Sequence, residues 1–245
     1  HAIQYLLGNQ TQENLESFRA LGGAQSYPSR TKDADDVDFS TGSVGLGPAM
    51  TLFASMVQDY LRRHVEDFRK ADLGRMIALV GDAEMDEGNM YEAIWEGWKH
   101  GLRNCWWIID YNRQSLDGVV TDHLFRLIDR LFRATGWRVI TIKYGKLMME
   151  AFQRPGGRTL RKWINDCPNE LYSALTFQGG AAWRDQLTAD IGCEPEAARL
   201  IACYTDEALG ELMTNLGGHC LESVLNAFST AAQNDSSSPY GVWRG

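Results

Sequence analysis

Two short apolar runs, each followed at once by an acid or an amide, constrain the fold of this chain more than any other feature. Met76 to Val80 ends at Gly81-Asp82, and Trp106 to Ile109 ends at Asp110-Tyr111-Asn112. Short apolar runs of this kind are typical of buried parallel strands. Because residues 89–100 repeat apolar side chains at helical spacing, we predict a strand–helix–strand unit. Its crossover should be right-handed, and both strand tips should lie at the same end of the sheet.

The two strand tips supply a carboxylate, Asp82, and an amide oxygen, Asn112, with a backbone carbonyl nearby and no histidine or thiolate. Hard oxygen ligands of this kind suit Mg²⁺ or Ca²⁺, with water and phosphate oxygens in the remaining positions. Asp and Asn also punctuate loops in proteins of every function. Spacing alone therefore leaves two readings open, a metal site or two ordinary strand ends.

A second candidate binding element is the glycine-rich stretch 40–48, which leads into a strong helix predicted from about Pro48 to Lys70. Proline suits the first turn of a helix because its missing N–H is not needed there. Glycines before a helix N-terminus let the backbone approach a ligand closely, and the helix start favours an anion. A glycine-rich turn is a weak signal by itself, so a purely structural turn is the alternative.

The rest of the chain predicts an α/β fold, a mainly parallel sheet flanked by helices, with a helical appendage. We expect an α/β core over 1–145, the appendage over 146–216, and a final helix and tail over 217–245. A third strand is predicted at 137–142, whereas Val242-Trp243 is too short to assign. The first residues resemble a helix already under way, so we expect a part of the core to be missing before them.

Composition excludes several classes of function. The net charge of −8 argues against general nucleic-acid binding, which requires clustered Lys and Arg. Five scattered cysteines favour a reducing compartment. Because no apolar stretch approaches the roughly 20 residues that span a bilayer, we expect a cytoplasmic protein that does not enter a membrane. The chain begins with His rather than Met, which leaves a removed leader open.

At this point the residues resemble a known family. The segment 81–87, Gly-Asp-Ala-Glu-Met-Asp-Glu, followed by Asn112 within 110–118, resembles the thiamine diphosphate signature, in which Gly-Asp-Gly is followed further along by Asn. More specifically, the chain resembles the homodimeric first component, the decarboxylating dehydrogenase, of the pyruvate dehydrogenase complex, within the transketolase-like superfamily. Nearly the whole chain is covered, because further segments fall in that family's order: Ser26-Tyr27-Pro28, Val44-Gly45-Leu46-Gly47-Pro48, Gly136-Trp137, Tyr204-Thr205-Asp206-Glu207 and Gly217-Gly218-His219.

The resemblance implies a diphosphate-binding half-site for thiamine diphosphate and Mg²⁺, with Ca²⁺ as an alternative ion. Asp82, the Asn112 side chain and the Gln114 backbone carbonyl would ligate the metal. Gly81, Ala83 and Glu84 would line the phosphate cleft. Gly42, Val44 and Gly45 would meet the aminopyrimidine through backbone atoms, and Leu116 would pack against the rings.

Departures from the family pattern matter for the chemistry. Ser29 stands where the family usually has an active-site histidine, and a hydroxyl cannot take up a proton near neutral pH as imidazole can. Ala83 replaces a glycine close to the phosphates, and Cys220 replaces an aspartate. We expect His219 to shape a helix entry, and His1 to be a helix residue rather than a ligand.

The resemblance therefore implies decarboxylation of a 2-oxo acid, with pyruvate expected, and transfer of the acyl or aldehyde unit. No segment resembles the pyrimidine-binding domain that supplies the activating glutamate, so we assign no catalytic residue to this chain. The expected partners are a chain or domain that completes the site in a homo- or hetero-oligomer, dimeric in the family, and a lipoyl acyltransferase component. Two alternatives stay open, transketolase-type ketol transfer and a non-catalytic binding or assembly module.

Overall fold

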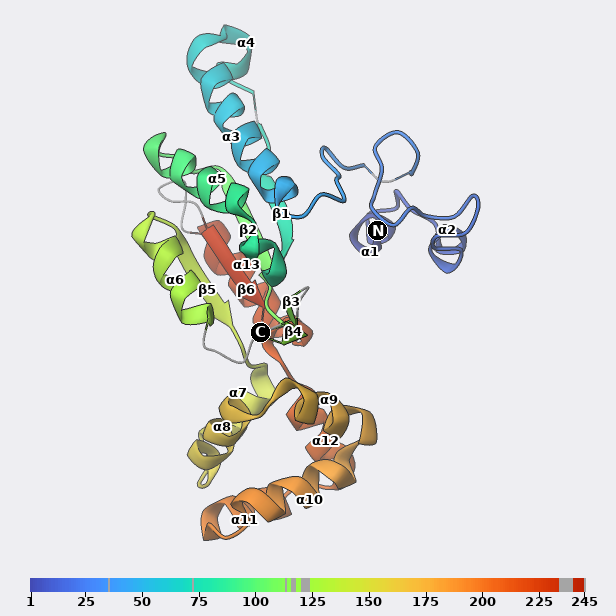
Figure 1. Cartoon of the computed structure of the whole chain (residues 1–245), viewed down its shortest axis with the longest axis vertical. Helices are drawn as coiled ribbons and strands as arrows, with labels where there is room; N and C mark the ends of the chain where they lie inside the picture. Colours follow the sequence, from blue (N-terminus) through green and yellow to red (C-terminus); the bar gives the residue numbers. More distant parts are fainter. Residues whose placement is uncertain are drawn as a thin grey trace. The chain divides into compact units, whose positions relative to one another are not determined.

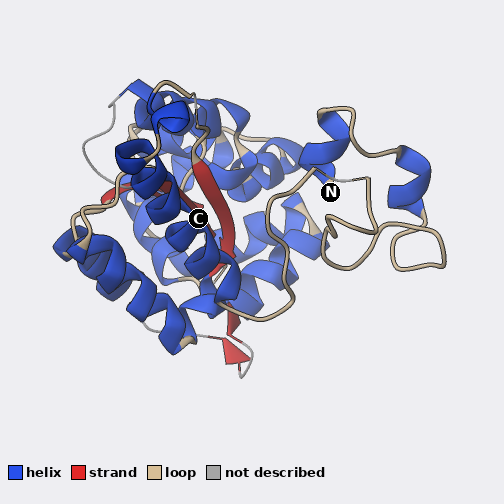
Figure 2. Cartoon of the chain, turned by 90° about the horizontal axis from the view of Figure 1, so that it is seen from above, coloured by secondary structure: helices blue, strands red, loops and turns tan. Residues whose placement is uncertain are grey.

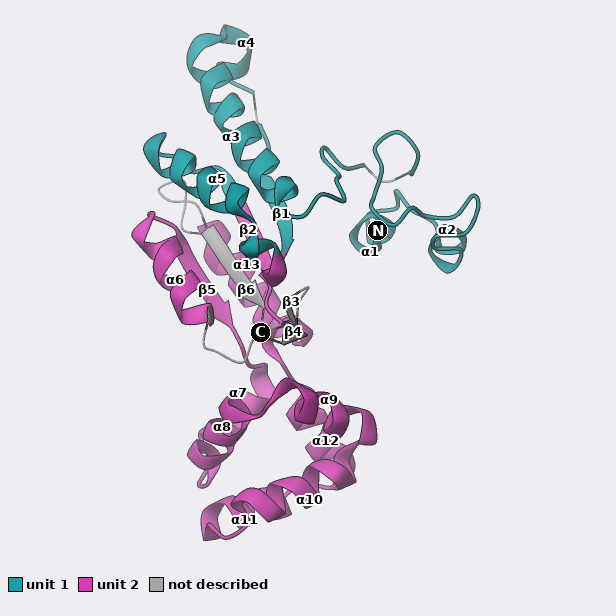
Figure 3. Cartoon of the chain, in the orientation of Figure 1, with its two compact units in different colours: residues 1–80, 84–105 teal, residues 81–83, 106–245 magenta. Residues whose placement is uncertain are grey.

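The computed structural model describes residues 1–34, 36–71, 73–112, 114–115, 118–119, 124–233 and 240–244. The chain divides into two compact units, which Figure 3 shows in different colours. The first unit comprises residues 1–80 and 84–105, and the second comprises 81–83 and 106–245. Helices make up most of the regular structure in both (Figure 2).

The first unit is organised around two packed helices. Its elements, labelled in Figure 1, are α1 (Ala2–Leu6), α2 (Gln12–Glu16), α3 (Leu46–His64), α4 (Glu66–Arg69), β1 (Met76–Gly81), the 3-10 turn η1 (Asp82–Asp86) and α5 (Gly88–Lys99). The last residue of β1 and the first two residues of η1, 81–83, belong to the second unit. Leu52 of α3 is fully buried, and a Cβ on Gly97 of α5 would lie 3.0 Å from its Cδ1. Glycine therefore permits the close packing of these helices. The helix predicted over 48–70 is interrupted, because Val65 is extended between α3 and α4.

A parallel sheet forms the base of the second unit. Strand β6 (Tyr240–Arg244) lies between β2 (Cys105–Asp110) and β5 (Arg138–Ile142), and Tyr240 aligns with both Trp106 and Arg138. The tail that the sequence left unassigned is thus a central strand. A separate antiparallel pair joins β3 (Gln114–Ser115) to β4 (Gly118–Val119).

Helices cover both faces of this sheet because successive side chains of a strand point to opposite sides. Trp106 contacts Phe228 of α13 (Leu221–Gln233), with ring centroids 6.1 Å apart. Its neighbour Trp107 contacts Phe132 of α6 (Leu124–Ala134) at 5.8 Å. The α/β fold with a parallel sheet flanked by helices is thereby confirmed.

Six helices between β5 and β6 in the chain share a hydrophobic core of their own. They are α7 (Lys146–Phe152), α8 (Gly157–Asp166), α9 (Asn169–Gln178), α10 (Gly180–Ile191), α11 (Pro195–Ala202) and α12 (Asp206–Thr214), followed by the turn η2 (Gly217–His219). Trp183 and Leu187 are fully buried in that core. The domain boundaries at 145 and 216 remain a proposal. Among the described residues, no helix combines the length and apolarity needed to cross a membrane.

Candidate functional site

The two predicted strand tips meet through the Asp82 carboxylate. Asp82 begins η1 directly after β1, and only 9% of it is exposed. The Asn112 backbone N–H donates to Asp82 Oδ2 at 3.1 Å, and the Ala83 N–H donates to Oδ1 at 3.1 Å. The carboxylate therefore joins two segments that are 30 residues apart in sequence.

The donor set at these tips fits a hard divalent cation. Each carboxylate oxygen has more than one lone pair, so a bond to one N–H does not exhaust it. The Asn112 backbone N–H holds Asp82, and its carbonyl accepts from Asn169 Nδ2 at 3.0 Å. The Gln114 backbone follows two residues later, at the start of β3. Where residues are described, no group of three or more His, Cys, Asp or Glu is placed to hold a metal.

Leu116, the predicted ring contact, lies outside the described residues. The side chain of Gln114 also lies outside them, although the backbone carbonyl is the predicted ligand there. The predictions for these two positions therefore rest on the sequence resemblance.

A second hydrogen bond joins two of the predicted cofactor-binding residues within the first unit. The Gly45 N–H donates to Glu84 Oε2 at 2.9 Å, at the N-terminus of α3. This carboxylate supplies the anion that a helix start favours. The sequence placed both residues in the site but did not reveal that they are bonded to each other.

Two positions of this turn favour glycine, Gly45 and Gly42. Gly45 has φ +79°, in the left-handed region, and a Cβ there would lie 2.8 Å from Asn89 Oδ1 and 2.9 Å from Glu87 Cβ. At Gly42 a Cβ would lie 2.7 Å from Cε2 of Tyr27. Val44, between the two glycines, is exposed and accessible to a ligand.

Ala83 fits the turn in which it replaces the family's glycine. Within the described ranges Arg19 is the one non-glycine residue with positive φ, so the Ala83 backbone is unstrained. The turn is held from α5, where the Tyr91 hydroxyl donates to the Met85 carbonyl at 2.5 Å. Burial raises the pKa of Tyr91, and the nearby Asp86 raises it further, so the hydroxyl stays a donor near neutral pH. Sequence reasoning missed this tyrosine.

The other singled-out residues lie in structural positions. The Ser29 N–H donates to Asp33 Oδ2 at 2.8 Å, in the loop before the glycine-rich turn. His1 is the N-cap of α1 rather than a residue within that helix, and its Nε2 lies 2.6 Å from the Gln25 carbonyl oxygen.

His219 and Cys220 lie before α13. His219 is exposed in the turn η2. The Cys220 Sγ accepts from the Lys146 N–H at 3.4 Å. A hydrogen bond from Ser223 lowers the pKa of the Cys220 thiol, with a smaller contribution from Lys146.

Comparison with known proteins identifies the family of this chain. Residues 1–153 match the family described as transketolase, thiamine diphosphate binding domain. The pyruvate dehydrogenase E1 component of Escherichia coli (strain K12) is 31% identical over 239 residues, which are 95% of this chain and 26% of that protein. The corresponding protein of Cupriavidus necator is 29% identical over 235 residues, or 94% of this chain and 25% of its own length. The chain thus spans about a quarter of the length of these relatives.

Solved structures support the fold. A transketolase from Leishmania mexicana aligns with a TM-score of 0.54 and 16% identity, over 96% of this chain and 24% of its own length. A transketolase variant from Pichia stipitis aligns with a TM-score of 0.50 and 16% identity, over 94% of this chain and 24% of its own. From the family match over residues 1–153 and the pyruvate dehydrogenase relatives, we conclude that this chain belongs to the family of transketolase thiamine diphosphate-binding domains.

Proposed function

We propose that this chain supplies the diphosphate- and Mg²⁺-binding half of an enzyme that decarboxylates a 2-oxo acid, with pyruvate as the substrate, and transfers the resulting acyl or aldehyde unit. The observation that carries the proposal is the meeting of Asp82 with Asn112, because it places a buried carboxylate and an amide residue at one point. The relatives named pyruvate dehydrogenase E1 component support the choice of pyruvate.

Each site residue has a proposed task. Asp82, the Asn112 side chain and the Gln114 carbonyl would hold Mg²⁺, and Gly81, Ala83 and Glu84 would line the phosphate cleft. The turn with Gly42, Val44 and Gly45 would meet the aminopyrimidine through its backbone, and Leu116 would pack against the rings. When bound, thiamine diphosphate supplies the carbanion chemistry that breaks the bond between the carboxyl and carbonyl carbons.

The catalytic trigger would come from a partner. We propose that a pyrimidine-binding domain or chain completes the site in an oligomer, and that a lipoyl acyltransferase component takes up the acyl unit. Ser29, which lies in the position of the family's histidine, cannot accept a proton near neutral pH. The chain's own contribution is therefore to bind and orient.

Calorimetry of the 245-residue chain with Mg²⁺ and thiamine diphosphate tests the binding half of the proposal. We expect affinity to require the metal and Asp82→Asn to weaken it at least about tenfold, because the amide keeps the shape of the side chain but loses the charge. Asp67→Asn, which removes an exposed carboxylate on α4, is the matched control and should bind as the unmodified chain does. Equal affinities for the Asp82→Asn variant and the unmodified chain would contradict the metal assignment.

Turnover assays test the reaction. The chain alone should not decarboxylate pyruvate, and adding a chain that carries a pyrimidine-binding domain should give pyruvate-dependent release of carbon dioxide. Turnover of a ketose phosphate but not pyruvate would indicate transketolase-type transfer instead. Metal-dependent binding without turnover of either substrate would indicate a non-catalytic module.

A further inference from the structure

A pocket of about 420 Å³ lies within the helical region. Its walls come from α8, from the connection between α8 and α9, and from the C-terminal end of α10 with the turn that follows. We call it the α8–α10 pocket. None of its lining residues is among those proposed to hold the cofactor. Its volume is in the range of sites for small molecules.

One side of the α8–α10 pocket is apolar. Cys167 and Ile191 are buried there, and the partly buried Trp163 and Leu171 pack against the core of the helical region. The Trp163 ring meets the fully buried Trp183 edge to face, with ring centroids 6.0 Å apart. The apolar wall is therefore continuous with a packed core, so it offers a fixed surface to the apolar body of a ligand.

The other side of the pocket is charged, and negative charge prevails. Asp166, Asp190 and Glu194 line it with a single ammonium, that of Lys162. In the part of the chain that the structure describes, none of these four groups forms an ion pair. Over the same ranges no three His, Cys, Asp or Glu side chains are grouped to hold a metal ion. The carboxylates therefore suit an organic cation better than an inorganic one.

Two of these carboxylates are held in place by neighbouring donors. The Trp163 indole N–H and Gln186 Nε2 both donate to Asp190 Oδ2, each at 2.8 Å. Thr159 Oγ1 donates to Glu194 Oε2 at 2.6 Å. The bonds from Gln186 and then from Trp163 lower the pKa of Asp190, so it stays ionised near neutral pH. Each carboxylate thus keeps its second oxygen for a ligand and loses little freedom when one binds.

We propose that the α8–α10 pocket binds a small organic ammonium compound. Its apolar body would lie against Trp163, Leu171 and Ile191, and its ammonium group would meet the carboxylates of Asp190 and Glu194. An ammonium carries three N–H donors, so it can bond both carboxylates, and its charge also suits an indole ring. A neutral ligand would desolvate the carboxylates without pairing them, and an anion would be repelled.

Calorimetry of the 245-residue chain with phenethylammonium tests the class of ligand, without thiamine diphosphate or a substrate. We expect a dissociation constant below about 1 mM, with 2-phenylethanol at least about tenfold weaker and phenylacetate weaker still, because the three share one apolar body and differ in charge. No binding of phenethylammonium at about 5 mM would overturn the proposal. Equal affinity for the ammonium and the alcohol would overturn the role of the carboxylates.

Variants test the location of binding. Asp190→Asn with Glu194→Gln should weaken phenethylammonium at least about tenfold, because the amides keep the shape but lose the charge. Asp185→Asn with Glu211→Gln, which removes two exposed carboxylates of α10 and α12 outside the pocket, is the matched control and should not change the affinity. Equal affinities for the two double variants would overturn the site. Circular dichroism checks that each variant is folded.

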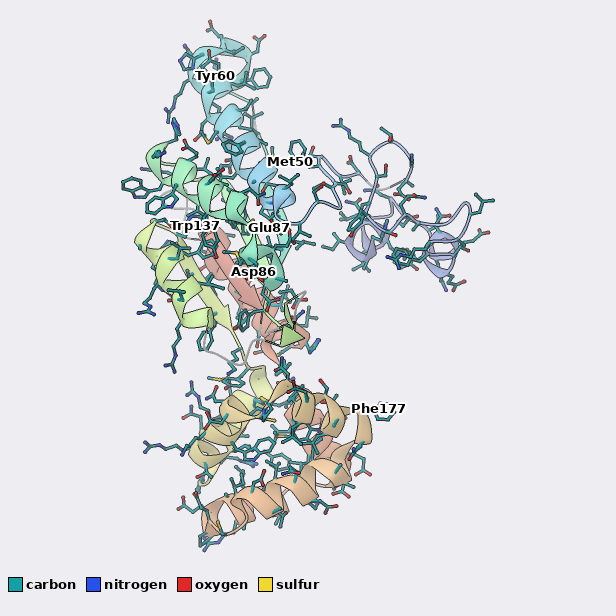
Figure 4. The ribbon with its side chains drawn as sticks, viewed as in Figure 1. Met50, Tyr60, Asp86, Glu87, Trp137 and Phe177 are labelled. Atoms are coloured by element: carbon teal, nitrogen blue, oxygen red, sulfur yellow. The ribbon has the colours of Figure 1, made fainter. Side chains whose placement is uncertain are left out.

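The indole N–H of Trp163 gives a second readout that does not depend on a charge change. In ¹⁵N-labelled chain, phenethylammonium should shift the Trp163 indole resonance, assigned with Trp163→Phe, because this N–H donates to Asp190 in the pocket wall. Phe177 is 93% exposed and points away from α9 (Figure 4), so Phe177→Ala should leave the titration unchanged. Loss of binding in Phe177→Ala, or an unshifted Trp163 resonance at saturation, would place the amine outside the α8–α10 pocket and overturn the proposal.

Discussion

The helical region from Tyr144 to Leu216 buries its large apolar side chains within itself, whereas helix α3 buries one of its two apolar faces. In the helical region Trp183, Leu187 and Leu209 are all at most 1% exposed and belong to one core. On α3, Leu52 is fully buried while the adjacent Phe53 is 45% exposed. Similar residue types thus have different tasks in the two regions.

This difference bears on which side chains stabilise the fold. A helix that packs against its neighbours on one side needs polar residues on the other, and the helical region follows that rule with exceptions such as Phe177. Helix α3 breaks it, because every exposed position from residue 46 to 60 carries a large apolar side chain. Burial of apolar side chains therefore contributes more to stability in the helical region than on the outer face of α3.

The largest effect should come from the core of the helical region. Trp183→Ala should lower the free energy of unfolding by about 3–5 kcal/mol, because it leaves a cavity among Trp163, Tyr172 and their neighbours. Urea unfolding followed by circular dichroism measures this loss. Phe177→Ala, at an exposed position of α9, should change it by less than about 0.5 kcal/mol. A loss below about 1 kcal/mol for Trp183→Ala would mean that this core does not stabilise the region.

Two adjacent residues of α3 sharpen the comparison. Leu52→Ala should cost about 2–5 kcal/mol at any protein concentration, because Leu52 packs against α5 within one chain. Phe53→Ala should cost less than about 1 kcal/mol in dilute protein. Equal losses for the two variants in dilute protein would place Phe53 in the core of the single chain.

The strands and helices that could be predicted were those with strong local patterns. The apolar runs at 76–80 and 106–109 predicted β1 and β2 because each is short, apolar and bounded by turn residues. Strand β6 was missed because it contains Gly241 and ends in Arg244. Its extended form comes from pairing with β2 on one side and β5 on the other, and no local signal carries that information.

The site divides in the same way. The proximity of Asp82 and Asn112 follows from the rule that parallel strands end at one edge, so the sequence could predict it. The bond from Gly45 to Glu84 could not be predicted, because it depends on how the turn packs on η1. The apolar residues of α3 were visible in the sequence, but only the exposed fractions show which of them, such as Phe53 and Tyr60, face outward.

A smaller effect should come from a polar tie in the helical region. The Arg184 guanidinium donates to Asp206 Oδ1 and to the carbonyls of Ile201 and Tyr204, so its planar fork joins α10 to α11 and α12. Arg184→Lys keeps the charge but cannot make all three bonds, and should cost about 1–2 kcal/mol in urea unfolding. Arg158→Lys, at an exposed position of α8, is the control. No difference between the two variants would mean that the fork contributes only charge.

The smallest effect tests the connection of the helical region to α13, where the contacts are exposed. Cys220 accepts hydrogen bonds from Ser223 and from the Lys146 N–H at the start of α7, and these lower its thiol pKa. The folded state therefore gains stability from the thiolate above the ordinary thiol pKa, and loses it as the pH falls through the lowered value. In a Cys193→Ser, Cys203→Ser background, the rate of alkylation of Cys220 should rise at lower pH in folded protein than in urea. Ser223→Ala should move the folded profile toward the unfolded one, because it removes the largest cause of the shift. If the folded and unfolded profiles coincide, the hydrogen bonds from Ser223 and Lys146 do not stabilise the Cys220 thiolate.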